Sequence, residues 1–234
     1  MRPLLLWRYE VRRAGWAAVL APPLVAAIVV LLAVVDAADG ADQRGTVIRN
    51  LFAALEMGLP LVAGIGAASL VGRDPAAELQ LTVPTPYRAT LLRRLAVVVG
   101  WTALVALLIA AVLLVIDGWA DRPQAHGAVV GQLVWLAPTL WLAAVGFLAG
   151  AVFRGPAAAG GLVAVLWMIE QILTEAVQQH QWSRLLYLFA TSQGTVPADW
   201  TGNRLTLVAT AIVLGIAAWL LLGGTERLVR GEAG

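Results

Sequence analysis

The chain has 234 residues, of which 60% are hydrophobic and only 13% are charged. Soluble domains usually have about a quarter charged residues and somewhat under half apolar ones, so this composition indicates a membrane protein. The chain has no cysteine, which excludes disulfides and thiolate metal sites. All 16 basic residues are arginine, a bias typical of GC-rich bacterial genomes, and they are too scattered to indicate a nucleic-acid partner.

Six apolar stretches are each long enough to cross a bilayer, whose roughly 30 Å hydrocarbon core requires about 20 residues of helix. Unpaired backbone amides cannot face lipid, so these stretches must be helical. We therefore predict an all-α, polytopic membrane protein in which the whole chain, 1–234, forms a single transmembrane domain. The predicted spans are residues 15–35, 51–71, 95–116, 129–153, 157–177 and 205–222.

The arginines predict the orientation of these spans. With the N-terminus inside, 11 of the 16 arginines lie on the inner side and 5, including Arg204, on the outer side. Because inner loops of membrane proteins are enriched in basic residues, we expect both termini in the cytoplasm of a bacterial cell. Trp119, Trp182 and Trp200 fall near predicted membrane interfaces, where an amphipathic ring is favoured.

The first 13 residues mix leucines with Arg2, Arg8, Arg12 and Arg13. A basic amphipathic stretch of this kind can lie as a helix in the plane of the interface. It can equally serve as a plain positive-inside anchor. Both readings place it on the cytoplasmic face.

Prolines and small residues within the spans predict kinks and close helix packing. Proline removes a backbone donor and bends its helix, which applies to Pro22, Pro23, Pro60 and Pro138. Small residues four apart let helices approach closely. Gly146 and Gly150 form one such pair, and Gly64, Gly66, Ala67 and Ala68 give the second span a small-residue face.

The inner connection between the second and third spans carries two helix-start signals. Asp74 can cap a helix that has Pro75 at its first position, and Thr85 with Pro86 repeats the arrangement. A short helix is therefore expected from about residue 75 to 82. It is either a well-capped loop or a docking element for a cytoplasmic partner.

Two carboxylates lie within predicted spans, where a charge costs several kcal/mol unless it is paired or hydrated. Glu56 and Glu170 are both expected in the outer half of the membrane. At about 100° per residue, Glu170 shares one helix face with Gln171 and Thr174. We predict that these four residues line a transport path. The alternative for the face of Glu170 is a structural hydrogen bond to a neighbouring helix, or snorkelling of the carboxylate to Arg49 or Arg184.

The outer segment 178–204 is long for a hairpin between spans. Its middle, residues 182–190, is apolar yet too short to cross the membrane. We expect an interfacial or re-entrant helix before the last span.

The connection after the second span resembles that of permeases of the ABC-2 type exporter family. The matching residues are Arg73 and Asp74, then Leu81 to Pro84 and Arg88, then Arg93 and Arg94. The layout of an N-terminal interfacial helix, six spans and a long outer connection also matches. Many family members have Glu-x-x-x-Gly-Thr in this loop, and here the stretch reads Asp-Pro-Ala-Ala-Glu-Leu-Gln.

The resemblance implies a permease subunit that exports an amphipathic cargo such as a drug, antimicrobial peptide or lipid. Two copies of a separate cytoplasmic ATPase would bind ATP-Mg, and a second permease copy or a related permease would complete the path between them. The chain itself would be no enzyme and would hold no cofactor or metal. The implied ATPase-coupling residues are Arg73, Asp74, Pro75, Glu78, Leu81, Pro84, Thr85 and Arg88.

Two other functions remain open at this point. One is the substrate-binding membrane subunit of a vitamin importer, against which the capped inner loop argues. The other is an intramembrane enzyme that uses Glu56 and Glu170, which would require both carboxylates within reach of one substrate atom. The chain has no lysine, so it has no GxxxxGK[ST] phosphate loop, and HExxH and GxSxG motifs are also absent.

Overall fold

A computed structural model describes residues 16–39, 42–72, 87–120, 130–192 and 199–229. Within these residues the structure consists of helices and turns and contains no strand, which confirms the predicted all-α class. In this described part of the chain, four helical stretches are long and apolar enough to cross a membrane, and two more apolar helices are shorter. The long stretches are Gln43–Val71, Arg88–Val115, Val130–Phe153 and Trp200–Gly223, and the shorter ones are Val19–Val35 and Pro156–Ile172.

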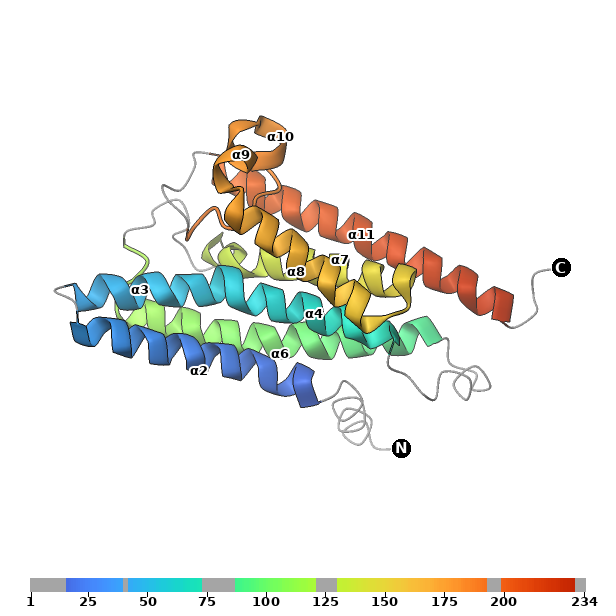
Figure 1. The fold of residues 1–234 in the computed structure, drawn as a ribbon, viewed down its shortest axis with the longest axis horizontal. Coiled ribbons are helices and arrows are strands. Elements are labelled where there is room, and N and C mark those ends of the chain that lie inside the picture. Colours follow the sequence, from blue (N-terminus) through green and yellow to red (C-terminus); the bar gives the residue numbers. More distant parts are fainter. Residues whose placement is uncertain (1–15, 40–41, 73–86, 121–129, 193–198, 230–234) are drawn as a thin grey trace.

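The described elements are, in chain order, α2 (Trp16–Asp39), α3 (Gln43–Ala53), η1 (Ala54–Gly58), α4 (Leu59–Gly72), α6 (Tyr87–Val115), η3 (Val130–Gln132), α7 (Leu133–Phe153), α8 (Pro156–Ile172), α9 (Thr174–Gln179), α10 (Gln181–Arg184) and α11 (Trp200–Val229). Successive long elements reverse direction along the bundle, so that the start of α2 and the end of α11 lie at the same end (Figure 1). We call this end, where α4 finishes and α6 begins, the α4–α6 end. The opposite end carries two short helices and is called the α9–α10 end.

Helix α2 tolerates Pro23 because a neighbouring helix replaces the hydrogen bond that this proline removes. Pro23 has no N–H to donate to the carbonyl four residues earlier, that of Val19. The indole Nε1 of Trp101, on α6, donates to this carbonyl at 2.7 Å. A neighbour that satisfies the freed backbone group is what allows proline inside an apolar helix.

Replacing Trp101 by phenylalanine should therefore lower the free energy of unfolding by about 1 kcal/mol, the usual value of one such hydrogen bond. The same change in a Pro23→Ala background should cost less, because residue 23 can then donate to the Val19 carbonyl itself. Unfolding in mixed detergent measures both. An equal cost in the two backgrounds would contradict the compensation.

The second span is interrupted by a single wide turn, η1, in which the N–H of Leu59 donates to the carbonyl of Ala54, five residues back. Pro60 explains its position, because its ring clashes with the carbonyl four residues earlier, that of Glu56. Such π-turns inside α-helices are frequent at functional sites. In this chain the turn contains Glu56.

Helices α4 and α7 cross at the small residues that the sequence singled out, which confirms their predicted role in packing. A methyl group built on Gly146 would lie 2.1 Å from the Gly64 carbonyl oxygen. One built on Gly150 would lie 2.9 Å from the Ala68 carbonyl oxygen. The two backbones are therefore in direct contact, and α4 is held between α7 and α8.

The fifth predicted span, 157–177, is not one continuous helix. Helix α8 starts at Pro156, a favoured first position, and ends at Ile172. Leu173 leaves the helical conformation, and α9 begins at Thr174. The helix face that Glu170 was predicted to share with Gln171 and Thr174 is therefore interrupted before Thr174.

The predicted N-terminal interfacial helix and most of the predicted coupling connection lie outside the described residues. Of the coupling residues only Arg88 is described. It lies in the first turn of α6, with its guanidinium carbon 4.7 Å from the centre of the Trp219 ring on α11.

Candidate functional site

Part of the chain between α10 and α11 enters the bundle without helical structure. Residues 185–192, which we call segment 185–192, form turns rather than the helix expected here. Its central residues are buried, with 0–3% of each exposed from Tyr187 to Thr191. Irregular backbone at such depth is stable only if other groups satisfy its N–H and C=O groups. The contacts of this backbone therefore define the site.

Glu56 accepts hydrogen bonds from two consecutive amides of this segment. Thr191 N–H donates to one carboxylate oxygen at 2.8 Å, and Ser192 N–H donates to the other at 2.5 Å. The wide turn η1 places this carboxylate, and its side chain has no exposed area. A charge so placed is tolerated only when it is paired and hydrogen-bonded.

Arg204 supplies the opposite charge. It lies in the second turn of α11, forms an ion pair with Glu56, and is also fully buried. Its second terminal nitrogen donates to the Leu188 carbonyl at 2.9 Å, so one guanidinium binds both the carboxylate and the segment. The Thr191 hydroxyl oxygen accepts from Arg204 at 3.0 Å and from the Trp200 indole at 2.9 Å.

Two further side chains bind the backbone of this region. Glu170, at the end of α8, accepts a hydrogen bond from the Leu188 amide at 2.7 Å. Asn203 donates to the carbonyls of Arg184 and Tyr187, both at 2.9 Å. Side chains from η1, α8 and α11 thus converge on a few peptide groups of one irregular segment.

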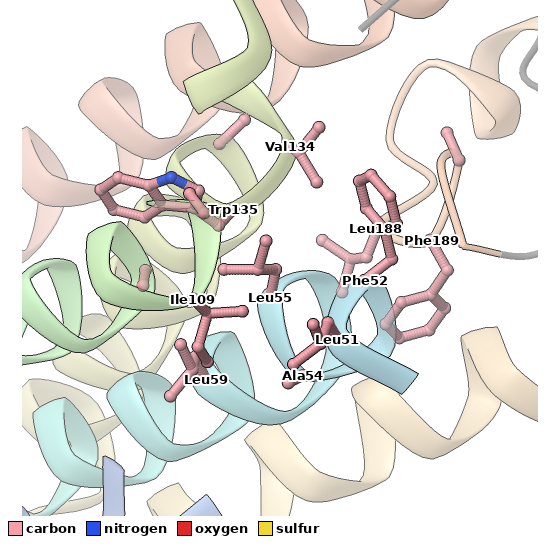
Figure 2. Close-up of a cluster of buried hydrophobic side chains, with 14 of the residues drawn as sticks. Leu51, Phe52, Ala54, Leu55, Leu59, Ile109, Val134, Trp135, Leu188 and Phe189 are labelled. Atoms are coloured by element: carbon pink, nitrogen blue, oxygen red, sulfur yellow. The ribbon is translucent and has the colours of Figure 1, made fainter. Parts of the chain in front are cut away.

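Apolar side chains surround this polar cluster. Leu188 and Phe189 of the segment belong to the same buried cluster as Phe52 of α3 and Val134 of α7 (Figure 2). The ring of Phe189 also packs edge-on against Trp167 of α8, with centroids 5.9 Å apart. The segment is therefore held by its side chains in the apolar core and by its backbone on charged groups.

The hydrogen bonds and the ion pair of this arrangement anchor segment 185–192 in the bundle. Both oxygens of Glu56 accept backbone N–H groups, and Glu170 likewise binds an amide rather than an open surface. A buried ion pair contributes little net stability compared with an apolar pair, but the loss of one partner is costly. Among the described residues no group of three or more potential ligands is placed to hold a metal ion.

The predicted path residues come together only in part. Glu56 and Glu170 both bind segment 185–192, but Glu56 is buried rather than beside a hydrated surface. Gln171 is half-buried. Thr174 follows the break after α8, and its hydroxyl donates to the carbonyls of Glu170 and Gln171, both at 3.0 Å.

The residues that sequence reasoning missed are Arg204, Asn203 and Trp200. The sequence places Arg204 among the outer arginines and Trp200 near an interface, yet neither has any exposed area. One signal in the sequence was available. A glutamate within a membrane span needs a partner, and Arg204 stands next to the start of the last apolar stretch. Trp119 is also buried, whereas Trp182 is exposed as expected at an interface.

Comparisons with protein-family models, with curated proteins and with solved structures give no match to this chain.

Proposed function

We propose that this chain is the permease subunit of an ABC exporter of the ABC-2 type, which moves an amphipathic cargo outward. One observation carries the proposal beyond the resemblance of the inner connection. The irregular segment before the last apolar helix is pinned into the bundle by a buried ion pair, as an outer closure of a transport path requires. Short helices and a re-entrant segment at this position are also part of the layout of the family.

The proposed orientation puts the α4–α6 end in the cytoplasm. Arg88, Arg93 and Arg94 lie in the first turns of α6 at this end, and Arg154 ends α7 there. The opposite connections carry the acidic Asp42, Asp117 and Asp199. Positive charge on the cytoplasmic side supports this orientation, with both termini inside.

Six spans are part of the proposal. Helix α2 has 24 residues, or about 36 Å of helix, which is enough to cross. Helix α8 has 17 residues, or about 25 Å, and is short for a bilayer. A short span can be accommodated by local thinning of the bilayer, and with α8 the proposed number of spans is six.

In the proposed function, segment 185–192 closes the outer end of the path, and the ion pair of Glu56 and Arg204 keeps the segment in its closed position. Glu170, Gln171 and Thr174 border the segment from α8 and α9. A second copy of the chain, or a related permease, would complete the path. Two ATPase subunits would bind ATP-Mg and dock on the connection 73–86, on residues Arg73 to Thr85, with Arg88 behind it.

Co-purification tests this function. The tagged chain, extracted gently from its native membrane, should bring down a stoichiometric soluble subunit that carries a phosphate-loop motif. Replacing residues 74–85 by a Gly-Ser linker of equal length should release that subunit. The matched control is the same replacement of residues 121–128 in the connection between α6 and η3, which should leave the complex intact.

Each outcome has a definite meaning. A second, different permease in the complex would make it a heterodimer while the exporter stands. The absence of any ATPase under conditions that preserve known complexes would overturn the exporter assignment.

A further inference from the structure

Helix α11 joins the two ends of the bundle without interruption. It has 30 residues and no proline, and it packs mainly along α7. Only 22% of its most apolar stretch is buried, so it is the least enclosed of the long helices. Its main neighbour along its length is α7, and side chains of other elements contact it near its two ends.

At the α9–α10 end, α11 holds segment 185–192. Arg204 binds Glu56 and the Leu188 carbonyl, and Asn203 binds the carbonyl of Tyr187. Arg184 and Asp199 add an ion pair at 2.8 Å just before the helix begins. Any displacement of this end of α11 therefore strains the contacts that keep the segment in place.

At the α4–α6 end, α11 is held by Arg88. The guanidinium lies over the Trp219 ring, at 4.7 Å from its centroid, a geometry that favours a cation on an aromatic face. A methyl group built on Gly223 would lie 2.6 Å from a terminal nitrogen of Arg88. Trp219 and Gly223 are four residues apart and share one helix face, so together they form the contact site for the Arg88 side chain.

We propose that α11 is the element that couples Arg88 to the closure at segment 185–192. Arg204 and Trp219 are about 22 Å apart along the axis at 1.5 Å per residue. Hydrogen bonds near 2.9 Å are lost when donor and acceptor separate to about 3.6 Å, so a shift of about 1 Å in α11 would break the hold of Arg204. The assignment of the ends to inside and outside rests on the proposed function, since Arg88 directly follows the connection given to the ATPase.

The absence of cysteine allows a clean reporter. The side-chain oxygen of Ser192 is buried and its amide binds Glu56, so Ser192→Cys places one buried thiol within the closing segment and leaves that amide in place. The rate at which a membrane-impermeant maleimide labels this thiol in vesicles reports opening. In the otherwise unchanged chain labelling should be slow, and Arg204→Gln should accelerate it strongly.

Arg88→Ala should accelerate labelling of this distant thiol by about fivefold or more, the lower range of measured couplings between sites. Gly223→Ala should do the same without removing a charge, because the new methyl displaces the guanidinium from Trp219. Arg93→Ala is the matched control. Arg93 is exposed on the same helix end, and its loss should leave the rate unchanged.

Three results would overturn the coupling. The first is a labelling rate for Arg88→Ala and Gly223→Ala that stays within about twofold of the parent, while Arg204→Gln opens the site. The second is an equal acceleration by Arg93→Ala, which would show a general loosening. If Arg204→Gln itself had no effect, the anchoring role of Arg204 would fall and the coupling with it.

The experiment needs no ATPase, so its failure differs from failure of the exporter function. Coupling without a co-purifying ATPase would leave α11 linking two ends of a membrane protein of another kind. If an ATPase co-purifies but this coupling is absent, the exporter assignment stands and another element must link the two ends.

Discussion

Replacing Arg204 by glutamine should lower the free energy of unfolding by about 3–5 kcal/mol, the usual cost of removing one partner of a buried ion pair. Glu56 would then be left in an apolar core with two amide donors and no cationic partner. The Leu188 carbonyl would lose its charged donor as well. Reversible unfolding in mixed detergent, with burial of a thiol at position 192 as a second readout, measures the loss.

A double-mutant cycle separates the ion pair from the other contacts of its members. Glu56→Gln should also be costly, because the amide NH2 of glutamine faces donors where a carboxylate oxygen accepted them. The double replacement Glu56→Gln with Arg204→Gln should cost clearly less than the sum of the two, since no charge is left unpaired. Additive losses would contradict direct coupling between the two side chains.

Arg184→Gln is the matched control for the charge itself. Its pair with Asp199 lies at the same end of the bundle, with side chains 38% and 33% exposed. Ion pairs of this exposure are screened by water and typically contribute up to about 1 kcal/mol. A loss as large as that of Arg204→Gln would show that burial is not the source of the effect.

Exchanging the two charges should fail to restore stability. An arginine at position 56 would direct donors at the amides of Thr191 and Ser192, which are donors themselves. The anchoring role therefore requires the carboxylate on η1 and the guanidinium on α11. Full recovery of stability after the exchange would show that the site needs only an ion pair, whichever position carries each charge.

The helical class and most helix positions followed from sequence because hydropathy is a local signal. Each apolar stretch is long enough to require a helix whatever its neighbours are, and α6, α7 and α11 lie near their predicted positions. The boundary that failed was the end of the fifth stretch. There the chain leaves the helix after Ile172, although its composition up to residue 177 suits a span.

The site was only half visible in the sequence because its partners are far apart along the chain. Glu56 and Glu170 stood out as charges within apolar stretches. Glu56 and Arg204 are 148 residues apart, and the amides that Glu56 binds belong to turns whose sequence gives no periodic signal. Only the packing of α11 and segment 185–192 against η1 shows that Arg204 is a buried partner.

Replacing Gly146 by alanine should lower the free energy of unfolding by at least about 2 kcal/mol, because overpacking a tight contact forces the backbone to move. The new methyl would lie 2.1 Å from the Gly64 carbonyl oxygen and 3.1 Å from the Ala68 nitrogen, so it meets backbone rather than a flexible side chain. Helices α4 and α7 would have to separate. Thermal unfolding in detergent measures the effect.

The same change should also reach the site, which makes it a test of how the fold supports the closure. Helix α4 continues from η1, so moving it away from α7 shifts Glu56 relative to segment 185–192, and a thiol at position 192 should be labelled faster. Gly161→Ala on α8 is the control. A methyl there meets nothing within 4 Å, and alanine is the better helix former by up to about 1 kcal/mol. Loss of stability in both variants would contradict a specific contact, whereas loss in Gly146→Ala with unchanged labelling would show that the closure is held independently of the α4–α7 crossing.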